Sequence, residues 1–204
     1  DLSDELIEVM AESKHILHQL HLPAQSGNDE ILRLMNRHYT REDYLRKVEK
    51  LRAAIPDIGL TTDLIVSFPG ETEDEFAQSL AFIRKCGFAE MHIFPYSRRP
   101  GTPADKMPGQ HGNAVKEARS RAAIAVAEEM SRAYREALVG SVQSVLFESV
   151  EDGLFTGHTP NYVKVYAAGE NLHNEIRDVM IKSVFQDGVL GEICAAKEVS
   201  GHEA

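Results

Sequence analysis

The spacing of hydrophobic and polar residues predicts alternating strands and helices over the first 137 positions. In the stretch TTDLIVSFPGET, the apolar run Leu64–Val66 is typical of a buried strand. Phe68–Gly70 then predicts a tight turn, and Thr72 with Glu75 makes a capping box that starts a helix. Ligands bind at the carboxyl ends of parallel strands, so we expect the chemistry of this protein near Ser67–Glu71.

Similar patterns predict the elements on either side of this stretch. Apolar spacing and capping residues predict helices over residues 3–13, from Asn28, from Thr40 to Pro56, from Thr72 to Gly87 and over 113–137. Strand-like runs cover residues 16–22, 61–66 and 91–94. This order favours an α/β architecture, either a parallel sheet or part of a barrel. The loop over residues 97–112 is too long for a plain connection, which indicates a functional or a disordered segment.

The pattern changes after Leu138. Short β-rich runs separated by turn residues occur at 141–149, 155–156, 162–167, 176–185 and 189–194. They predict a small all-β barrel that is closed or nearly closed, a shape that often binds oligonucleotides. We place a domain boundary at Ala137–Gly140 and expect residues 195–204 to form a frayed tail.

Charge and composition narrow the class of protein. The net charge of −10 excludes a generally basic nucleic-acid coat but leaves room for a local basic patch. With no signal peptide and no apolar run long enough for a membrane helix, we expect a cytoplasmic protein without a membrane partner. Cys86 and Cys194 lack metal-ligand spacing, so we expect reduced thiols. The chain opens with Asp1 instead of Met, directly before a predicted helix, which favours a missing upstream portion.

Several linked motifs carry a family resemblance. HLPAQSGNDEILRLMNRHYT, TDLIVSFPGETEDEF, FPYSRRPGTPA and GHTPNYVKV occur in this order. Together they resemble the radical S-adenosylmethionine methylthiotransferases that modify tRNA, over nearly the whole chain. HIFPYS and the pair Gly109-Gln110 are closer to the branch that acts on threonylcarbamoyladenosine beside the anticodon. Ser67 and Ala24 depart from the family, which usually has Gly at the first position and Leu or Val at the second.

The resemblance implies a domain organisation and a set of cofactors. Residues 1–112 would be the C-terminal half of a partial (β/α) radical barrel, 113–137 a connecting helix packed on it, 138–195 an RNA-binding β-barrel of the TRAM type and 196–204 a frayed tail. The full-length enzyme would use S-adenosylmethionine, two [4Fe–4S] clusters and an electron donor protein. This chain has no CxxxCxxC motif. Two distant cysteines cannot supply the cluster thiolates, so we expect no catalytic residue here and no activity from this part alone.

Candidate cofactor-binding residues lie at three predicted strand ends. The resemblance assigns Gln25 and Ser26 to the ribose or methionine portion of S-adenosylmethionine, Ser67–Glu71 to its adenine, and Tyr96 to stacking on adenine or a base. The motif therefore names these residues: Gln25, Ser26, Ser67, Phe68, Pro69, Gly70, Glu71 and Tyr96. Each has a structural alternative. Gln25 and Ser26 can cap the next helix, Ser67–Glu71 can be a plain βα turn, and Tyr96 can be a core residue.

Candidate RNA-binding residues fall into two groups. Arg98 and Arg99 follow the third strand, and guanidinium groups suit tRNA phosphate, but solvated loop charges explain them as well. Arg33, Arg37 and Arg41 could extend this patch, but a helix with a solvated basic face explains them just as well. In the β-barrel, the motif assigns RNA contacts to His158, Asn161 and Tyr162, and the alternative is a turn that supports the barrel.

A metal site is not expected from the histidines. Strand alternation puts His18 and His21 on opposite faces, so with His92 they are better explained as core or trough residues. The leading hypothesis is therefore part of an enzyme that adds a methylthio group to C2 of a modified adenosine in the anticodon region of tRNA. The alternative is a non-catalytic RNA-binding protein with a half-barrel and a TRAM-like module. A radical enzyme with another substrate is a lesser alternative.

Overall fold

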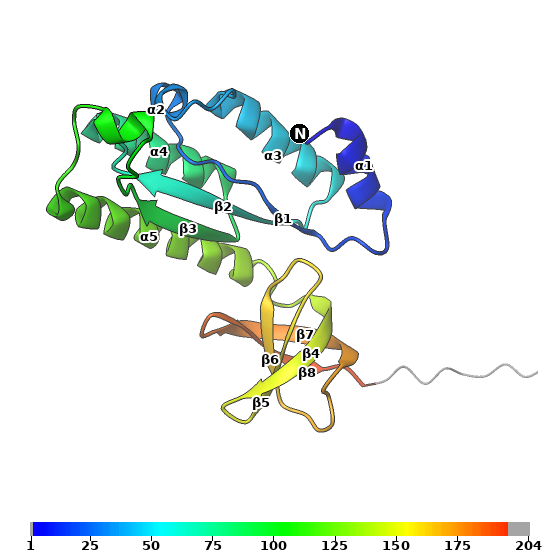
Figure 1. The fold of residues 1–204 in the computed structure, drawn as a ribbon. Coiled ribbons are helices and arrows are strands. Elements are labelled where there is room, and N and C mark those ends of the chain that lie inside the picture. Colours follow the sequence, from blue (N-terminus) through cyan, green and yellow to red (C-terminus); the bar gives the residue numbers. More distant parts are fainter. Residues whose placement is uncertain (1, 196–204) are drawn as a thin grey trace, which may run out of the picture. The chain divides into compact units, whose positions relative to one another are not determined.

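The structure is a computed structural model that describes residues 2–195 (Figure 1). The chain divides into two compact units, Asp1–Tyr134 and Arg135–Ala204, and the division falls shortly before the predicted boundary at Ala137. The tail predicted for residues 196–204 lies outside the described residues. Within the described part, no helix has the length and apolar character that a membrane span requires.

The first unit contains a parallel sheet of three strands in the order β1 (Gln19–His21), β2 (Gly59–Val66) and β3 (Glu90–Pro95). The strand predicted over residues 16–22 is shorter than expected. Its partner β2 begins only at Gly59, whose N–H donates to the carbonyl of His18 at 2.8 Å, so the residues before His18 have no strand to pair with.

The helices begin and end where the capping residues predict. They are α1 (Asp4–Glu12), α2 (Asp29–Leu34), α3 (Arg41–Ala54), α4 (Glu73–Cys86), the 3₁₀-helix η1 (Pro103–Lys106) and α5 (Asn113–Glu136). Thr40 and Thr72 both form complete capping boxes, at the starts of α3 and α4. Gly87 ends α4 in the left-handed conformation, as expected for a glycine at that position.

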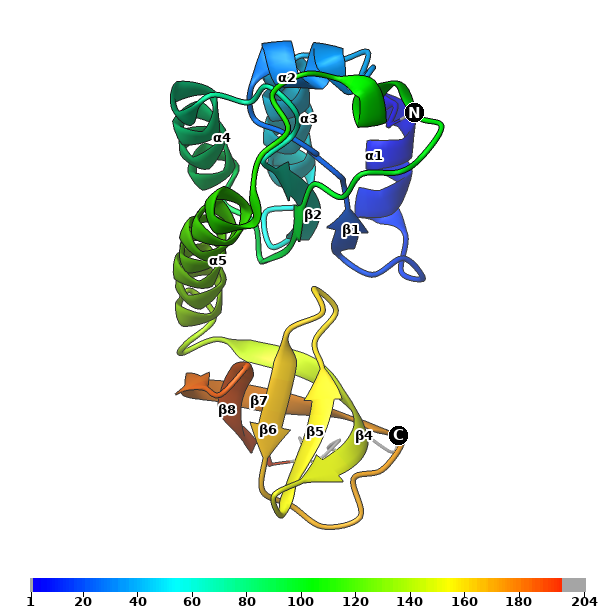
Figure 2. The ribbon, with the colours of Figure 1, turned by 60° about the vertical axis from the view of Figure 1, so that its left-hand side comes forward.

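The core of this unit lies between the sheet and the helices α3, α4 and α5 (Figures 1 and 2). Alternation along β2 buries Leu60, Thr62, Leu64 and Val66 on the helix side and leaves Thr61, Asp63 and Ile65 half-buried. One face of the sheet is therefore fully packed, and the opposite face remains partly open.

The second unit is a closed barrel of five strands in the order β4-β5-β6-β8-β7, which confirms the predicted short strands. They are β4 (Val142–Glu151), β5 (Leu154–His158), β6 (Lys164–Ala167), β7 (Glu175–Phe185) and β8 (Gly188–Ile193). Only β6 and β8 run parallel; the other neighbours are antiparallel. Closure needs a glycine at Gly157, because a Cβ there would lie 2.1 Å from the carbonyl oxygen of Leu146.

Candidate functional site

A pocket of about 500 Å³ lies at the carboxyl end of the parallel sheet. All three strands end at this edge, so the segments that follow them meet there. The pocket is lined by Gln25, Arg37, Asp63, Ile65, Phe68, Phe94, Pro95, Tyr96, Ser97, Arg99, Thr102 and Ala104. It brings together four of the predicted site residues, and its volume lies in the range typical of small-molecule sites.

Gln25 is held at the pocket by its backbone. Its N–H donates to the carbonyl of Asp63 and its carbonyl accepts from Ile65, both at 2.9 Å, which extends the pairing of β1 with β2 by one bridge. Gln25 adopts a positive φ of 63°, an unusual conformation for a residue other than glycine. Such strain in the wall of a pocket is typical of a functional position.

Ser26 turns away from this pocket. Its buried hydroxyl lies 3.3 Å from the hydroxyl of Ser79 and accepts the Asn28 N–H at 3.2 Å. Ser26 therefore supports the loop before α2, whereas the helix itself is capped by Asn28 and not by Gln25 or Ser26. A direct contact between Ser26 and a cofactor stays a prediction.

The turn after β2 is fixed by buried hydrogen bonds. Ser67 has a φ of 61°, and its N–H donates to Oε2 of Glu71 at 2.7 Å. The Gly70 N–H donates to the carbonyl of Gly109 at 3.0 Å, which ties the turn to the loop before α5. Of the predicted turn residues only Phe68 lines the pocket, so the rest of the turn shapes the wall rather than facing the cavity.

The Glu71 carboxylate is paired with Arg119 of α5. Nη1 of Arg119 lies 3.0 Å from Oε2 of Glu71, and the two residues are only 5% and 2% exposed. Burial raises the pKa of Glu71 to about 7, against the opposing effects of the Ser67 N–H and the Arg119 charge. Sequence reasoning missed Arg119. The sequence pattern that could have revealed Arg119 is its spacing: it lies four positions before Ala123, on the face of α5 that is buried.

Several buried polar atoms around this edge have no hydrogen-bond partner within the described residues. They are the Ser67 and Tyr96 hydroxyls, Oε1 of Gln110 and Nε2 of His111. Burial, with a smaller contribution from the Arg119 charge, lowers the pKa of His111, which keeps its imidazole neutral near pH 7. Native proteins satisfy most buried polar groups, and of these residues only Tyr96 lines the pocket, so its hydroxyl is the one placed to meet a bound ligand or an ordered water.

Tyr96 combines an aromatic wall with one of these polar atoms. Its ring packs edge-to-face on Phe68, with ring centroids 5.2 Å apart, and Nζ of Lys116 lies 5.7 Å from the ring centre. Its backbone N–H donates to the carbonyl of Val66 at 2.9 Å. Phe68 and Tyr96 therefore form an aromatic corner at the ends of β2 and β3.

Arg98 and Arg99, adjacent in sequence, have different environments. Arg98 donates from Nε to Oδ1 of Asp105 at 2.8 Å and from Nη2 to the Asp105 carbonyl at 2.9 Å, which braces the loop around η1. Arg99 lines the pocket together with Arg37, which follows α2. The RNA contacts predicted for Arg98 and Arg99 remain predictions. Of the three arginines that could extend their patch, the structure places Arg37 in the pocket wall.

The predicted RNA-binding motif of the barrel holds one stacked pair. The rings of His158 and Tyr162 lie 4.6 Å apart and 15° from parallel, and Tyr162 is 60% exposed. Nδ1 of His158 lies 3.0 Å from Oε2 of Glu148. Asn161 is only 3% exposed and accepts a hydrogen bond from the Thr159 hydroxyl, so its side chain supports the turn. RNA contacts by all three predicted residues stay predictions.

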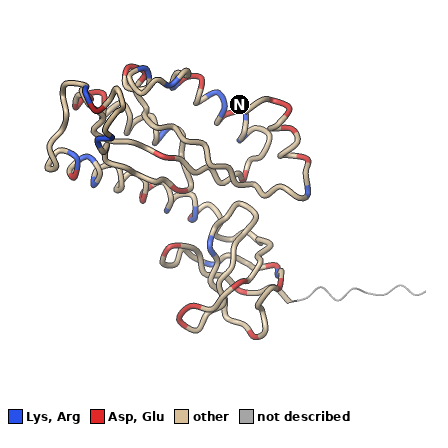
Figure 3. Tube along the Cα trace, viewed as in Figure 1, with Lys and Arg blue, Asp and Glu red and all other residues tan. Residues whose placement is uncertain are grey.

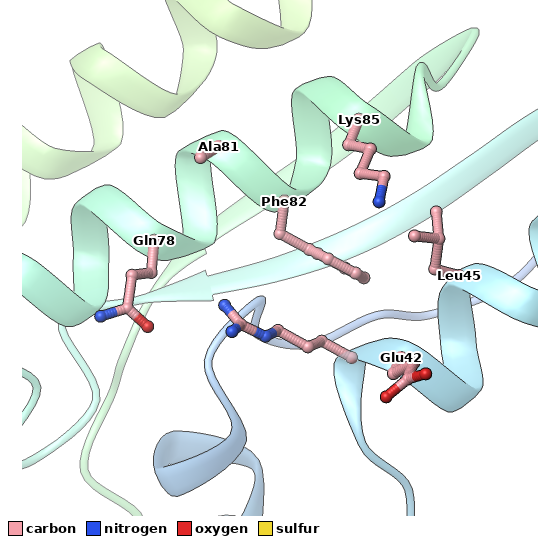
Figure 4. Close-up of a pocket in the computed structure, with 7 residues that line it drawn as sticks. Glu42, Leu45, Gln78, Ala81, Phe82 and Lys85 are labelled. Carbon is pink, nitrogen blue, oxygen red and sulfur yellow. The ribbon is translucent and has the colours of Figure 1, made fainter.

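The outer side of the first unit has a second pocket, of about 430 Å³, between α3 and α4 (Figure 4). Figure 4 shows Phe82 projecting from α4 between the two helices, on the side where Leu45 lies on α3. The remaining lining residues are the small Ala81 and long polar or charged side chains, and Phe82 belongs to the core. Among the described residues, none that lines this pocket has an unpartnered buried polar atom, so the pocket offers few groups that could bind a polar ligand.

The described residues contain no group of three or more His, Cys, Asp or Glu placed to hold a metal ion. His18 lies 2.9 Å from Asp57, and His21 lies 2.9 Å from the Thr61 hydroxyl. Cys86 is fully buried, and burial raises the pKa of its thiol to about 12. Cys86 and Cys194 lie in different units and cannot form the thiolate set of a four-iron cluster.

The first unit is similar to radical S-adenosylmethionine domains in sequence and in fold. Residues 1–83 match the family described as "Radical SAM superfamily". A solved structure titled "Coproporphyrinogen III oxidase (HemN) from Escherichia coli is a Radical SAM enzyme" is similar in fold, with a TM-score of 0.54 over 78% of this chain and 44% of that chain. Its sequence identity of 15% limits this likeness to the fold.

More particularly, the chain is a homologue of tRNA methylthiotransferases. It is 46% identical to tRNA-2-methylthio-N(6)-dimethylallyladenosine synthase of Caldicellulosiruptor saccharolyticus over 78% of its length, and covers 34% of that relative. It is 39% identical to threonylcarbamoyladenosine tRNA methylthiotransferase MtaB of Bacillus subtilis over 88% of its length, covering 41% of it. The same enzyme of Thermotoga maritima is 37% identical over 98% of the chain, with 46% of the relative covered. The chain thus spans less than half the length of each.

Proposed function

We propose that this chain is part of a tRNA methylthiotransferase that adds a methylthio group to C2 of N6-threonylcarbamoyladenosine beside the anticodon. The observation that carries the proposal is the pocket at the carboxyl edge of the sheet, in a chain homologous to such enzymes. Relatives named for dimethylallyladenosine and for threonylcarbamoyladenosine both match well. The choice of threonylcarbamoyladenosine as the substrate therefore rests on the residues HIFPYS and Gly109-Gln110.

The pocket fits the cofactor that the family implies. S-adenosylmethionine has a flat adenine, a ribose with two hydroxyls and a charged amino acid end. Phe68 and Tyr96 offer aromatic surface to the adenine, and Gln25 offers both donors and acceptors to the polar portion. Asp63 is the one carboxylate among the lining residues and can accept from a hydroxyl or an ammonium group. When bound, this cofactor supplies the radical and the methyl group.

The residues of this chain orient reactants rather than carry out bond chemistry. The turn after β2 is held by Glu71 and by Gly109, so the aromatic corner is in place before a ligand arrives. Iron–sulfur clusters do not fit the two cysteines present, and we propose that their ligands lie in other parts of the full-length protein. The barrel would add RNA affinity through the exposed Tyr162 and its stacked partner His158.

Charge on the barrel limits this contribution. In Figure 3 Asp and Glu outnumber Lys and Arg on the second unit, and residues 138–204 contain ten acidic residues against four Lys or Arg. Phosphate binding depends on cationic side chains, so the isolated barrel should bind RNA weakly. Most of the electrostatic attraction would then come from the first unit.

The direct test is nucleoside mass spectrometry of tRNA from cells with and without the gene. Loss of 2-methylthio-N6-threonylcarbamoyladenosine, with the dimethylallyl counterpart retained, is the expected result. Loss of the dimethylallyl form instead would keep the reaction type and change the substrate. Unchanged levels of both nucleosides would refute the proposed function.

A further inference from the structure

Two arginines from distant segments line the same pocket. Arg37 follows α2 and Arg99 follows β3, and both contribute to the cavity at the carboxyl edge of the sheet. Figures 1 and 2 both place α2 and the segment after β3 at the same end of the first unit. Both side chains are exposed, so they lie at the rim of the pocket and not in its floor.

The environment of these two guanidinium groups differs from that of their neighbours. Within residues 2–195, neither Arg37 nor Arg99 has a side-chain hydrogen bond or an ion pair. By contrast, Arg33 is 2.8 Å from Glu30, Arg41 is 3.7 Å from Asp29, and Arg98 is 2.8 Å from Asp105. Nearby arginines are thus neutralised by carboxylates, whereas the two at the pocket keep their donors available.

The pocket is therefore locally positive in an acidic chain. Arg37 and Arg99 face a single carboxylate, Asp63, among the lining residues, while the whole chain carries −10. Arginines with free donors that line one pocket are well suited to bind an oxyanion by charge-assisted hydrogen bonds. The aromatic lining beside them, which includes Phe68, Phe94 and Tyr96, suits a base or an adenine.

We propose that Arg37 and Arg99 form a subsite for a backbone phosphate of RNA next to the target nucleotide. The inference rests on the proposed function and names how the same pocket holds its substrate. Enzymes that modify a base take the nucleotide out of its stack and into a pocket, which brings its flanking phosphates to the mouth of that pocket. The rim position of both arginines fits a large polyanion that approaches from outside, whereas a fully enclosed small ligand would call for buried partners.

The test compares single variants in the whole encoded protein. Arg37→Gln and Arg99→Gln are measured against Arg46→Gln and Arg84→Gln, which remove the same charge from carboxylate-paired positions. The probe is a fluorescent anticodon stem-loop without the threonylcarbamoyl group, so that no nucleoside carboxylate is present. We expect each pocket variant to weaken binding roughly tenfold and to lower the salt slope by about 0.7, with the paired controls within roughly twofold of wild type.

A modified probe identifies the bound group. A neutral methylphosphonate linkage beside the target adenosine should weaken binding by the wild-type protein and have no further effect on the Arg37→Gln/Arg99→Gln double variant. Equal RNA affinity of pocket and control variants would overturn the inference. So would unchanged RNA affinity with weaker binding of S-adenosylmethionine, which would assign the arginines to the cofactor carboxylate. Because RNA affinity is measured separately from methylthiolated tRNA in cells, failure of the subsite and failure of the proposed function are distinguishable.

Discussion

The buried Glu71 carboxyl should give the first unit an unusual pH dependence. Replacing Glu71 with Gln keeps the shape of the side chain and removes its titration. The pKa of Glu71 is raised from 4.5 to about 7 by burial. For an acid with a raised folded pKa, stability is fully present below the unfolded pKa and is lost as the pH rises through the folded one.

The magnitude follows from the two pKa values. A shift from 4.5 to about 7 is worth about 3 kcal/mol in total, since one pKa unit corresponds to about 1.4 kcal/mol. Between pH 5 and pH 8, wild-type protein should lose about 2 to 3 kcal/mol of unfolding free energy relative to Glu71→Gln. Any change in hydrogen bonding to Ser67 and Arg119 adds an offset that does not vary with pH.

The assay is urea unfolding followed by far-ultraviolet circular dichroism at several pH values. Nearly all helical residues described lie in the first unit, so the helix signal reports on it. Glu73→Gln is the matched control, because Glu73 also accepts from Arg119, at 3.1 Å, but its side chain is 80% exposed. Its unfolding free energy should follow wild type across the pH range, since exposed ion pairs contribute little.

Two outcomes would refute the reasoning. A difference between wild type and Glu71→Gln that stays constant with pH would mean that Glu71 does not titrate in this range. A difference of the opposite sign, with the variant losing relative stability as the pH rises, would mean that Arg119 and the Ser67 N–H outweigh burial. In that case the pKa of Glu71 lies below its ordinary value.

Two further substitutions test the turn and the barrel. Gly109→Ala should destabilise the first unit by about 1 to 3 kcal/mol, because Gly109 has a φ of 73° and a Cβ would lie 2.9 Å from Cα of Gly70. The control is Gly112→Ala, which has no atom within 4 Å of the added Cβ and should leave the melting temperature unchanged. Equal melting temperatures for Gly109→Ala and Gly112→Ala would contradict the steric argument. Tyr162→Ala should leave unfolding unchanged but weaken RNA binding by about 1 to 3 kcal/mol, since Tyr162 is exposed and stacked on His158. Unaltered RNA affinity in a titration would exclude the stacking role.

Local interactions explain why much of the fold was readable from the sequence. Helix ends depend on residues within one helical turn, as in the capping boxes at Thr40 and Thr72 and the C-cap at Gly87. The residues that determine them are therefore close together in the sequence. The short strands of the barrel were predicted because turn residues separate them. The strand around His18 was overestimated, since its length depends on where β2 begins.

The sequence by itself determined the order of elements and the strand ends where a ligand would bind. Only the tertiary structure decided which of the candidate residues share a pocket. Arg99 lines it and Arg98 does not, and distant Arg37 joins it, although all three have the same side chain. Sequence patterns report local spacing, whereas burial and ion pairing depend on contacts between segments far apart in the chain. For the same reason the partner of Glu71 was visible only in the fold, where Arg119 approaches from 48 positions away.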